Sequence, residues 1–362
     1  MAEILVLDIA ASKTGALSVL EDFYGYIRDG LNDPANDLTN DPDSAGRRDH
    51  WTFVTGVHGI LEPVPERGIS VIVRDDVKSS QAARLRFELM NGGKWINGLA
   101  PDIVFSLENM LPRGIKNGTG QVVYIHQPVG FQREKRFSLF KKNEREQALY
   151  QKFYHKLIIA SAKRADRCVV QTGWMRAALL RDAGIPGDRV ETAPPVIPSL
   201  SEYVSPGEFQ SGSFFYPASD LPYKNHDVID RACAILKERG YFPEVLYTKD
   251  RVIPREEVFA HYNRSTLLFP SYIETFGMPL AEARQFGNPI IAADTEFARE
   301  VLEGYENAYF FAPFDPEALA GLMKDVMEGR ISPKAPETAG GRSGPYSKLV
   351  DIILQTDPAR QG

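Results

Sequence analysis

The sequence has few cysteines, no long hydrophobic run and no excess of positive charge. Among 362 residues only Cys168 and Cys233 are cysteines. They are too few and too isolated for a disulfide framework or a zinc site, so we expect a reducing, cytoplasmic environment. No apolar stretch reaches the ~20 residues that a membrane span needs. The formal net charge of -6 excludes a general nucleic-acid binder, so any basic surface must be local.

What is present is an ordinary globular composition, with 43% hydrophobic and 25% charged residues, in a chain long enough for two cores. Apolar runs at 4–7, 51–57, 69–73 and 102–106 are predicted as buried strands, and 81–98 as a helix between two of them. This alternation indicates a doubly wound α/β domain.

One stretch, residues 271–283, indicates a ligand site, since an apolar strand precedes it and another follows it. Pro279 fits a first helical turn because it needs no amide hydrogen there. The amides of Phe276, Gly277 and Met278 can then point outward from a helix N-terminus, which attracts phosphate.

Glu274 and Glu282 lie eight residues apart in the same stretch, one on the loop and one on the helix. Both carboxylates can therefore face one cleft. Carboxylates would repel a phosphate, but they accept hydrogen bonds from hydroxyls. Phosphate and hydroxyl recognition together predict a nucleotide-sugar site. The alternative is a surface helix with two solvated glutamates.

The stretch from Glu274 to Ala283, with its continuation from Gly287 to Asp294, resembles the E-x7-E signature of retaining GT-B glycosyltransferases of the family 4 type. The resemblance implies two Rossmann-like domains facing each other across a cleft that holds the active site. It implies that Glu274 faces the donor hexose and that Glu282 takes the ribose hydroxyls. It also implies that the amides at 276–278 meet phosphate and sugar.

Further donor contacts are expected from the resemblance in the second half of the chain. Lys224 and Asn225 match a K-N or K-G pair whose lysine binds the donor diphosphate, which suits a cation at a strand-to-helix turn. Leu221 stands where many relatives have a second cation, so either activity is reduced or another basic residue substitutes. Thr248, at the end of a predicted strand, is expected near the nucleotide base.

Two places in the first half of the chain also match positions of the glycosyltransferase family. Thr14 and Gly15 lie where the family has a glycine-containing loop that approaches donor phosphates or acceptor, and an ordinary strand-helix turn is the alternative. His126 ends the predicted strand at 122–128, as does a family histidine near the reacting sugar. Ligands of parallel sheets sit beyond such strand ends, although a lone histidine is often structural.

Basic and aromatic side chains alternate at the start of the segment 133–157, which suits an anionic membrane face. The alternative is a solvated helix with a core stripe. Relatives that make capsule or O-antigen use acceptors on a polyprenyl-diphosphate lipid, which such a surface could approach. We therefore expect a cytoplasmic protein that can lie peripherally on the inner face of the membrane.

The predicted domains are an N-terminal Rossmann-like acceptor-side domain at 1–192, a proline-rich linker at 193–212 and a C-terminal nucleotide-sugar domain at 213–345. A terminal helix and tail at 346–362 are expected to cross back to the first domain, as is common in this fold.

Together these features predict a retaining hexosyl- or deoxyhexosyltransferase of bacterial surface polysaccharide biosynthesis. It would move a sugar from a nucleotide diphosphate sugar to a glycan acceptor, without cofactor or metal. Alternatives are a GT-B nucleotide-sugar epimerase and a catalytically weak GT-B subunit that acts as a binding partner. The base, the sugar, the acceptor linkage and the oligomeric state stay open, because pocket shape decides them.

Overall fold

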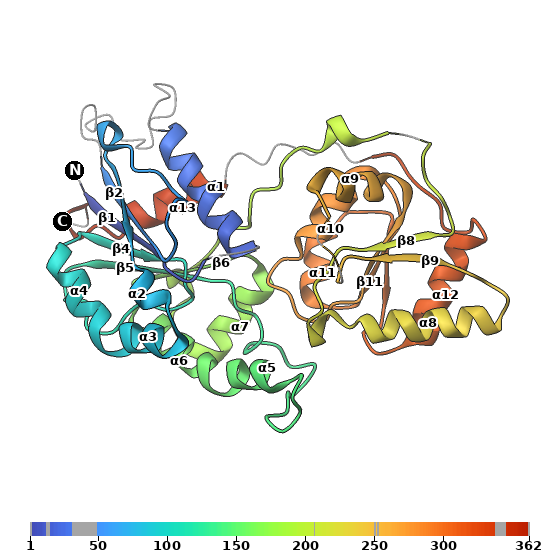
Figure 1. Cartoon of the computed structure of the whole chain (residues 1–362), viewed down its shortest axis with the longest axis horizontal. Helices are drawn as coiled ribbons and strands as arrows, with labels where there is room; N and C mark the ends of the chain where they lie inside the picture. The colour runs from blue at the N-terminus through green and yellow to red at the C-terminus, as the bar shows by residue number, and fades with distance from the viewer. Residues whose placement is uncertain are drawn as a thin grey trace. The chain divides into compact units, whose positions relative to one another are not determined.

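The computed structural model describes residues 2–11, 15–30, 49–205, 207–249, 251, 253–336 and 345–360 (Figure 1). The chain divides into two compact units. Unit 1 comprises Met1–Phe131, Lys152–Pro195 and Gly344–Gly362, and unit 2 comprises Gln132–Gln151 and Val196–Ser343.

Unit 1 contains a seven-stranded sheet in the order β3-β2-β1-β4-β5-β6-β7, in which every pair is parallel. Its strands are β1 (Glu3–Asp8), β2 (His50–Thr55), β3 (Ile69–Val73), β4 (Ile103–Ser106), β5 (Gly120–Ile125), β6 (Arg167–Val170) and β7 (Val190–Thr192). The strand order reverses beside β1, so β1 and β4 flank the switch point where ligands of such sheets bind.

Helices cover both faces of this sheet, because successive strand residues point to opposite sides. On one face Phe23 of α1 (Gly15–Gly30) packs against Phe105 of β4 and Tyr346 of α13 (Pro345–Leu354). On the other face Leu5 and Leu7 share a core with α2 (Asp75–Lys78), α4 (Gly92–Leu99), α6 (His155–Arg164) and α7 (Gly173–Ala183). The helix α3 (Gln81–Arg86) follows α2 and has no buried residue.

Unit 2 contains a five-stranded parallel sheet in the order β12-β11-β10-β8-β9. Its strands are β8 (Ser213–Tyr216), β9 (Glu244–Tyr247), β10 (Thr266–Phe269), β11 (Ile290–Ala293) and β12 (Ala308–Phe311). The order reverses beside β8, so the loops after β8 and β10 flank the switch point of this sheet.

Helices also cover both faces of the second sheet. The ring of Phe215 packs on Tyr262 of α9 (Arg255–Arg264), whereas the next strand residue, Tyr216, packs on His226 of α8 (His226–Glu238). α12 (Pro316–Met327) lies beside α8. The other helices are α10 (Met278–Ala283) and α11 (Glu296–Val301), and α5 (Arg145–Leu149) also belongs to this unit. Both units are doubly wound α/β layers, as predicted.

Several elements differ from the sequence expectations. The strand β7 (three residues, directly before proline-rich residues) and the helix α11 (six residues) were not predicted, because each is short. The expected helix at 81–98 is interrupted by a π-helical turn at Phe87–Asn91. The segment Gln132–Gln151 was expected in the N-terminal domain but belongs to unit 2. There burial raises the pKa of the Tyr272 hydroxyl, and the nearby Glu144 carboxylate raises it further.

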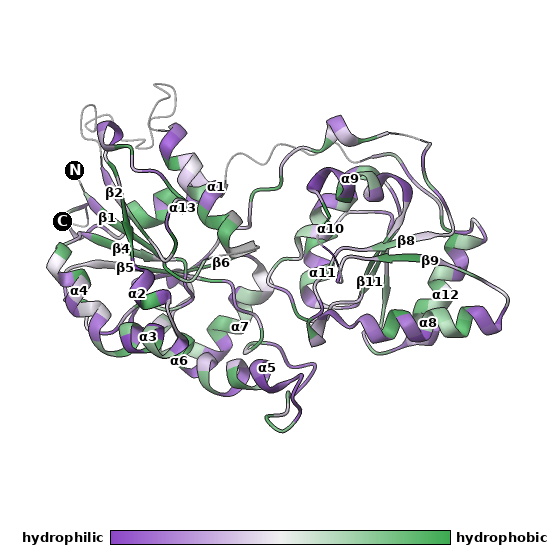
Figure 2. Ribbon diagram, viewed as in Figure 1, coloured by the Kyte–Doolittle hydropathy of each residue, from purple (hydrophilic) through white to green (hydrophobic). Residues whose placement is uncertain are grey.

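Hydrophobic residues are concentrated in the strands of both sheets, as Figure 2 shows in green. Among the described helices, none is both long enough and apolar enough to cross a membrane.

Candidate functional site

The loops at the switch point of unit 2 bring Lys224 and Glu274 together. Lys224 ends a short 3-10 helix after β8, and Glu274 lies in the loop after β10. The Lys224 ammonium forms an ion pair with Glu274 Oε1, and the Ser271 hydroxyl donates to the same oxygen at 2.8 Å. Only about a sixth of each charged side chain is exposed, at 17% and 16%. Two residues predicted from stretches fifty positions apart therefore form one site.

Asn225 shapes the turn that presents Lys224. Its backbone is left-handed, with φ 59°, a conformation that Asn and Gly tolerate better than other residues. Its side-chain amide donates to the carbonyl of Pro313 at 2.6 Å and to that of Pro270 at 3.3 Å. The Asn225 side chain thus ties the turn to two neighbouring loops. Tyr216 supports the same turn, because its hydroxyl donates to the Lys224 carbonyl at 2.7 Å.

Gly277 sets the direction in which α10 begins. Its backbone has φ 87° and ψ 64°, and the Leu280 amide donates to its carbonyl at 2.9 Å. The helix begins at Met278 with Pro279 in the first turn, as predicted. Phe276 and Gly277 precede the helix in the loop that also carries Glu274.

Glu282 is buried on α10 and contacts α9. Arg255 Nη2 donates to Oε1 at 2.5 Å, and the hydroxyl of the buried Tyr262 donates to Oε2 at 3.1 Å. Burial raises the pKa of the Glu282 carboxyl above its usual value, and Arg255 opposes that shift. The sequence analysis did not identify Arg255 or Tyr262. No spacing pattern links them to Glu282, and the contact arises only when α9 packs beside α10.

Thr248 follows β9 at the same edge of the sheet. Its amide donates to the Tyr216 carbonyl at 3.3 Å and its hydroxyl to the Ala218 carbonyl at 3.5 Å. Thr248 therefore lies beside the loop that leads to Lys224, where Ala218 and Leu221 also lie. Lys249, the next residue, places its ammonium 4.9 Å from the centre of the Tyr247 ring.

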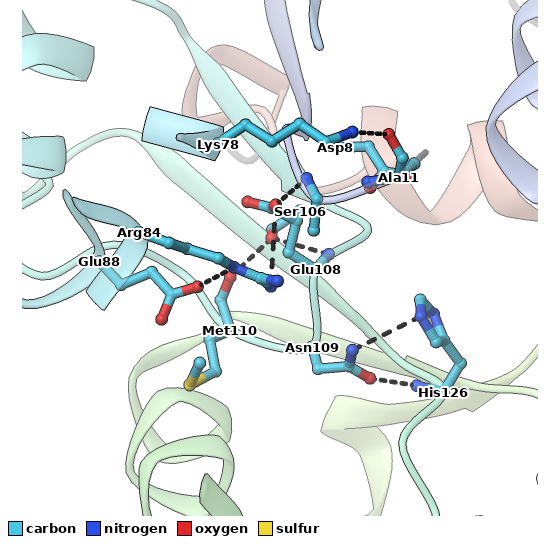
Figure 3. Close-up of polar contacts among 11 residues, drawn as sticks. Asp8, Ala11, Lys78, Arg84, Glu88, Ser106, Glu108, Asn109, Met110 and His126 are labelled. Atoms are coloured by element: carbon cyan, nitrogen blue, oxygen red, sulfur yellow. Dashed lines mark hydrogen bonds and ion pairs between the residues drawn. The ribbon is translucent and has the colours of Figure 1, made fainter. Parts of the chain in front are cut away.

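In unit 1, His126 directly follows β5 and is held by Asn109, which follows β4 (Figure 3). The His126 amide donates to Asn109 Oδ1 at 2.6 Å, and its Nε2 lies 3.5 Å from Asn109 Nδ2. Nδ1 is buried and has no hydrogen-bond partner among the described residues. Burial, and then the charge of Arg84, lowers the pKa of His126 to about 4. The imidazole is therefore neutral at neutral pH.

A buried charged cluster also lies at this edge, at the switch point between β1 and β4 (Figure 3). Glu108 Oε1 accepts from the Ala10 amide at 2.7 Å and lies 3.8 Å from Arg84 Nη2. Burial, and then Glu108, raises the pKa of Asp8 to about 8. Burial also raises the pKa of Glu88 to about 7, although Arg84 Nε donates to it at 2.9 Å. The sequence analysis missed this cluster, although Asp8 and Glu108 each follow a predicted strand.

Two N-terminal candidates remain. Thr14 lies outside the described residues, and Gly15 is the first residue of α1. Among the parts of the chain that the structure describes, no group of three or more His, Cys, Asp or Glu side chains is arranged to hold a metal ion.

Comparison with known proteins gives one family match and many structural neighbours. Residues 251–342 match the family model of Glycosyl transferases group 1. No curated protein matches the sequence significantly.

The similar solved structures cover nearly the whole chain. The lipopolysaccharide outer core galactosyltransferase WaaB, in its apo form, is 16% identical with a TM-score of 0.55, over 99% of this chain and 96% of that chain. Anabaena HepE in complex with UDP-glucose is 13% identical with a TM-score of 0.59, over 100% and 98% of the two chains. Sucrose-phosphate synthase from Thermosynechococcus elongatus is 13% identical with a TM-score of 0.58, over 100% and 98%.

At these identities the neighbours establish the fold, and the family match lies within unit 2, which carries Glu274 and Glu282. The predicted fold class is confirmed: the chain has the GT-B fold of two Rossmann-like α/β units, and residues 251–342 of its second unit match the Glycosyl transferases group 1 model.

Proposed function

We propose that the protein is a retaining glycosyltransferase that moves a hexosyl or deoxyhexosyl group from a nucleotide diphosphate sugar to a glycan acceptor. The observation that supports this most directly is the Lys224–Glu274 ion pair at the switch point of the unit that matches the glycosyltransferase model. A cation and a hydroxyl acceptor side by side suit the junction between a diphosphate and a sugar.

In this proposal each donor-site residue has one role. Lys224 neutralises charge on the departing diphosphate, together with the backbone amides of Phe276, Gly277 and Met278, so no metal is required. Glu274 accepts a hydrogen bond from the sugar, and Glu282 accepts from the ribose hydroxyls. In the free protein Lys224 pairs with Glu274. When the diphosphate binds, Lys224 gains a second anionic partner.

His126 would act on the acceptor side as a neutral hydrogen-bonding group. With a pKa of about 4 it does not supply a positive charge at neutral pH, but a neutral imidazole can accept a proton or a hydrogen bond from a sugar hydroxyl. Thr14 and Gly15 remain proposed donor or acceptor contacts. We propose that the acceptor is carried on a polyprenyl-diphosphate lipid in bacterial surface polysaccharide synthesis. One structural neighbour is a lipopolysaccharide outer core galactosyltransferase, which supports a role in surface glycan synthesis but names no polyprenyl acceptor.

The donor proposal is tested by thermal stabilisation of the purified protein with UDP, GDP, dTDP and ADP sugars, for the wild type and for Lys224→Ala. Lys237→Ala, an exposed lysine on α8, is the control. We expect one nucleotide class to raise Tm in the wild type and in the control but not in Lys224→Ala. If no nucleotide at millimolar concentration shifts the folded wild type, the non-catalytic subunit becomes the better account.

Retention of configuration is tested on the product. We expect NMR of the transferred sugar to show the anomeric configuration of the donor, whereas inversion would contradict a retaining enzyme. Donor hydrolysis lost in Glu274→Ala would argue for catalysis, because a binding subunit hydrolyses nothing in either form.

We also propose a peripheral membrane contact at the tip of the segment 133–157. Phe140 is 96% exposed and is followed by the exposed Lys141 and Lys142, a combination that suits an anionic lipid surface. Phe137, in contrast, is buried beneath the Lys135 ammonium, so only part of the segment is available.

Sedimentation with phosphatidylserine-containing and purely phosphatidylcholine vesicles tests this contact. We expect binding to the anionic vesicles only, reduced several-fold in Phe140→Ala. Phe242→Ala removes a ring that is 69% exposed in another part of unit 2 and should change nothing. Equal binding by both variants would exclude Phe140 as a membrane anchor.

A further inference from the structure

The only ionic partner that the described structure gives the buried Glu282 is an exposed arginine. The Glu282 side chain is 5% exposed and the Arg255 side chain 61%, and the two meet at 2.5 Å. Tyr262 approaches the other carboxylate oxygen from the core at 3.1 Å, and its ring is buried. Arg255 therefore covers the solvent side of the carboxylate.

The position of Arg255 is explained by Glu282 rather than by its own helix. Arg255 is the first residue of α9, where the helix dipole disfavours a positive charge. Its guanidinium also lies 5.2 Å from the centre of the Phe259 ring, which restricts the side chain while leaving it largely exposed. An arginine held there compensates a carboxylate that would otherwise be buried without a partner.

We propose that Arg255 is a positioning residue of the donor site: it holds the Glu282 carboxylate in place against Tyr262, ready to accept the two ribose hydroxyls. This rests on the proposed function, in which Glu282 is the ribose acceptor. A carboxylate offers about four acceptor positions, and Arg255 and Tyr262 use two of them. The remaining lone pairs match a vicinal diol.

The effect should depend on pH, because burial raises the pKa of Glu282 and Arg255 is the largest influence that lowers it. Tyr262 is the second. Among the described residues on the neighbouring elements, β10 carries no ionisable side chain. The turn after α10 and the helix α11 carry Arg284, Glu296, Arg299 and Glu300, and α9 also carries Glu256, Glu257, His261 and Arg264; after burial, the largest influences on the pKa of Glu282 come from Arg255 and Tyr262. Removing Arg255 therefore raises the pKa of Glu282 further, so that its carboxylate becomes protonated at a higher pH than in the wild type.

Calorimetric binding of UDP, GDP and ADP, each compared with its counterpart lacking both ribose hydroxyls, tests the proposal; dTDP, which offers only a 3′-hydroxyl, is compared with its 3′-deoxy form. The wild type should prefer the hydroxylated form by about ten-fold or more, the usual effect of a hydrogen bond to a charged group. In Arg255→Gln that preference should fall sharply and should partly return as the pH is raised. Affinity for the hydroxyl-free form should stay unchanged, which also shows that the variant is folded.

Three further variants complete the experiment. Arg255→Lys should restore most of the preference, and Glu282→Gln should remove it, with no additional loss in the Arg255→Gln/Glu282→Gln double variant. Arg299→Gln is the matched control. Like Arg255, Arg299 pairs with a carboxylate, at 2.5 Å from Asp294, and lies over an aromatic ring, 4.5 Å from the centre of Phe310, but its carboxylate partner is exposed.

Two results would overturn the inference while leaving the donor site intact. Equal or tighter binding of every nucleotide by Arg255→Gln would show that Arg255 only covers the carboxylate. An equal loss of affinity for the hydroxylated and hydroxyl-free nucleotides in Arg255→Gln would show that Arg255 contacts the diphosphate instead of acting through Glu282. If the wild type binds no nucleotide, the proposed function itself fails, together with this inference.

Discussion

Asp8 shows how a single buried side chain at the carboxyl end of a central strand can reduce stability. It ends β1, its Oδ1 accepts from the Ala11 amide at 3.2 Å, and burial together with Glu108 raises its pKa to about 8. Between about pH 4 and pH 8 the unfolded chain carries Asp8 ionised, whereas the native protein keeps it protonated. The native state then binds more protons, so its stability falls as pH rises through this window.

Asp8→Asn should therefore be more stable than the wild type at pH 8, by at least about 1 kcal/mol, since one pKa unit corresponds to about 1.4 kcal/mol. The neutral amide keeps an oxygen for the Ala11 amide. Urea unfolding at pH 4, 6 and 8 measures the effect, and the difference should shrink toward pH 4. Asp188→Asn, at an exposed carboxyl, is the control. A difference that does not change with pH would show that the native Asp8 is not protonated.

At the scale of elements, α10 depends on the glycine before it. An added Cβ at Gly277 would lie 3.2 Å from Leu280 Cδ1, and the backbone there is left-handed with φ 87°. The stretch at 271–283 can present its amides only if this turn is kept.

Gly277→Ala should lower the stability of unit 2 by about 1–2 kcal/mol, the usual cost of a left-handed non-glycine residue. We also expect it to weaken nucleotide binding, as measured by thermal unfolding and calorimetry. Gly321→Ala is the control: it lies within α12, its Cβ would meet nothing within 4 Å, and it should stabilise by about 0.5–1 kcal/mol. Unchanged stability and binding in Gly277→Ala would mean that the turn relaxes without consequence.

The C-terminal helix α13 is attached to unit 1 through its own apolar face and through the segment that follows it. Val350 and Ile353 are almost fully buried. Gly120, at the start of β5, lies directly against the Thr356 carbonyl, where a Cβ would collide.

Gly120→Ala should therefore push the C-terminal segment away from β5 and lower Tm by several degrees. Differential scanning fluorimetry with limited proteolysis measures this, and cleavage near residues 345–360 should become faster. Gly98→Ala, within α4 where nothing lies within 4 Å, should leave both unchanged or slightly stabilise the protein. Wild-type Tm in Gly120→Ala would show that the segment moves aside at little cost.

At the scale of the whole molecule, the chain builds two units, and each takes residues from separate parts of the sequence. Each has its own sheet and its own buried core, so each can unfold as a cooperative body. The glycosyltransferase match and the donor candidates belong to unit 2.

Scanning calorimetry should resolve two transitions, and the nucleotide that stabilises the protein should raise only that of unit 2. Ile353→Ala should lower the free energy of unfolding of unit 1 by about 2–5 kcal/mol, and so shift only its transition to lower temperature, because the change removes a fully buried side chain from unit 1. A single transition shifted by both changes would show that the units do not unfold separately.

The strands and the donor-site residues could be predicted from sequence because they depend on local patterns. Buried parallel strands appear as continuous apolar runs, and the predicted runs at 51–57 and 69–73 correspond to β2 and β3. The position of Pro279 indicated the start of α10 because proline restricts helices at identifiable places.

The partners of these residues came only from tertiary packing. The sequence alone determined the α/β class, the site stretch and the types of side chain offered to a ligand, because hydrophobic period, proline and glycine act over a few residues. The structure decided that Lys224 pairs with Glu274, that Arg255 reaches Glu282 and that Asp8 lies near Glu108. Those contacts join segments 27 or more residues apart, and no local preference specifies which distant elements pack together or how deeply a charge is buried.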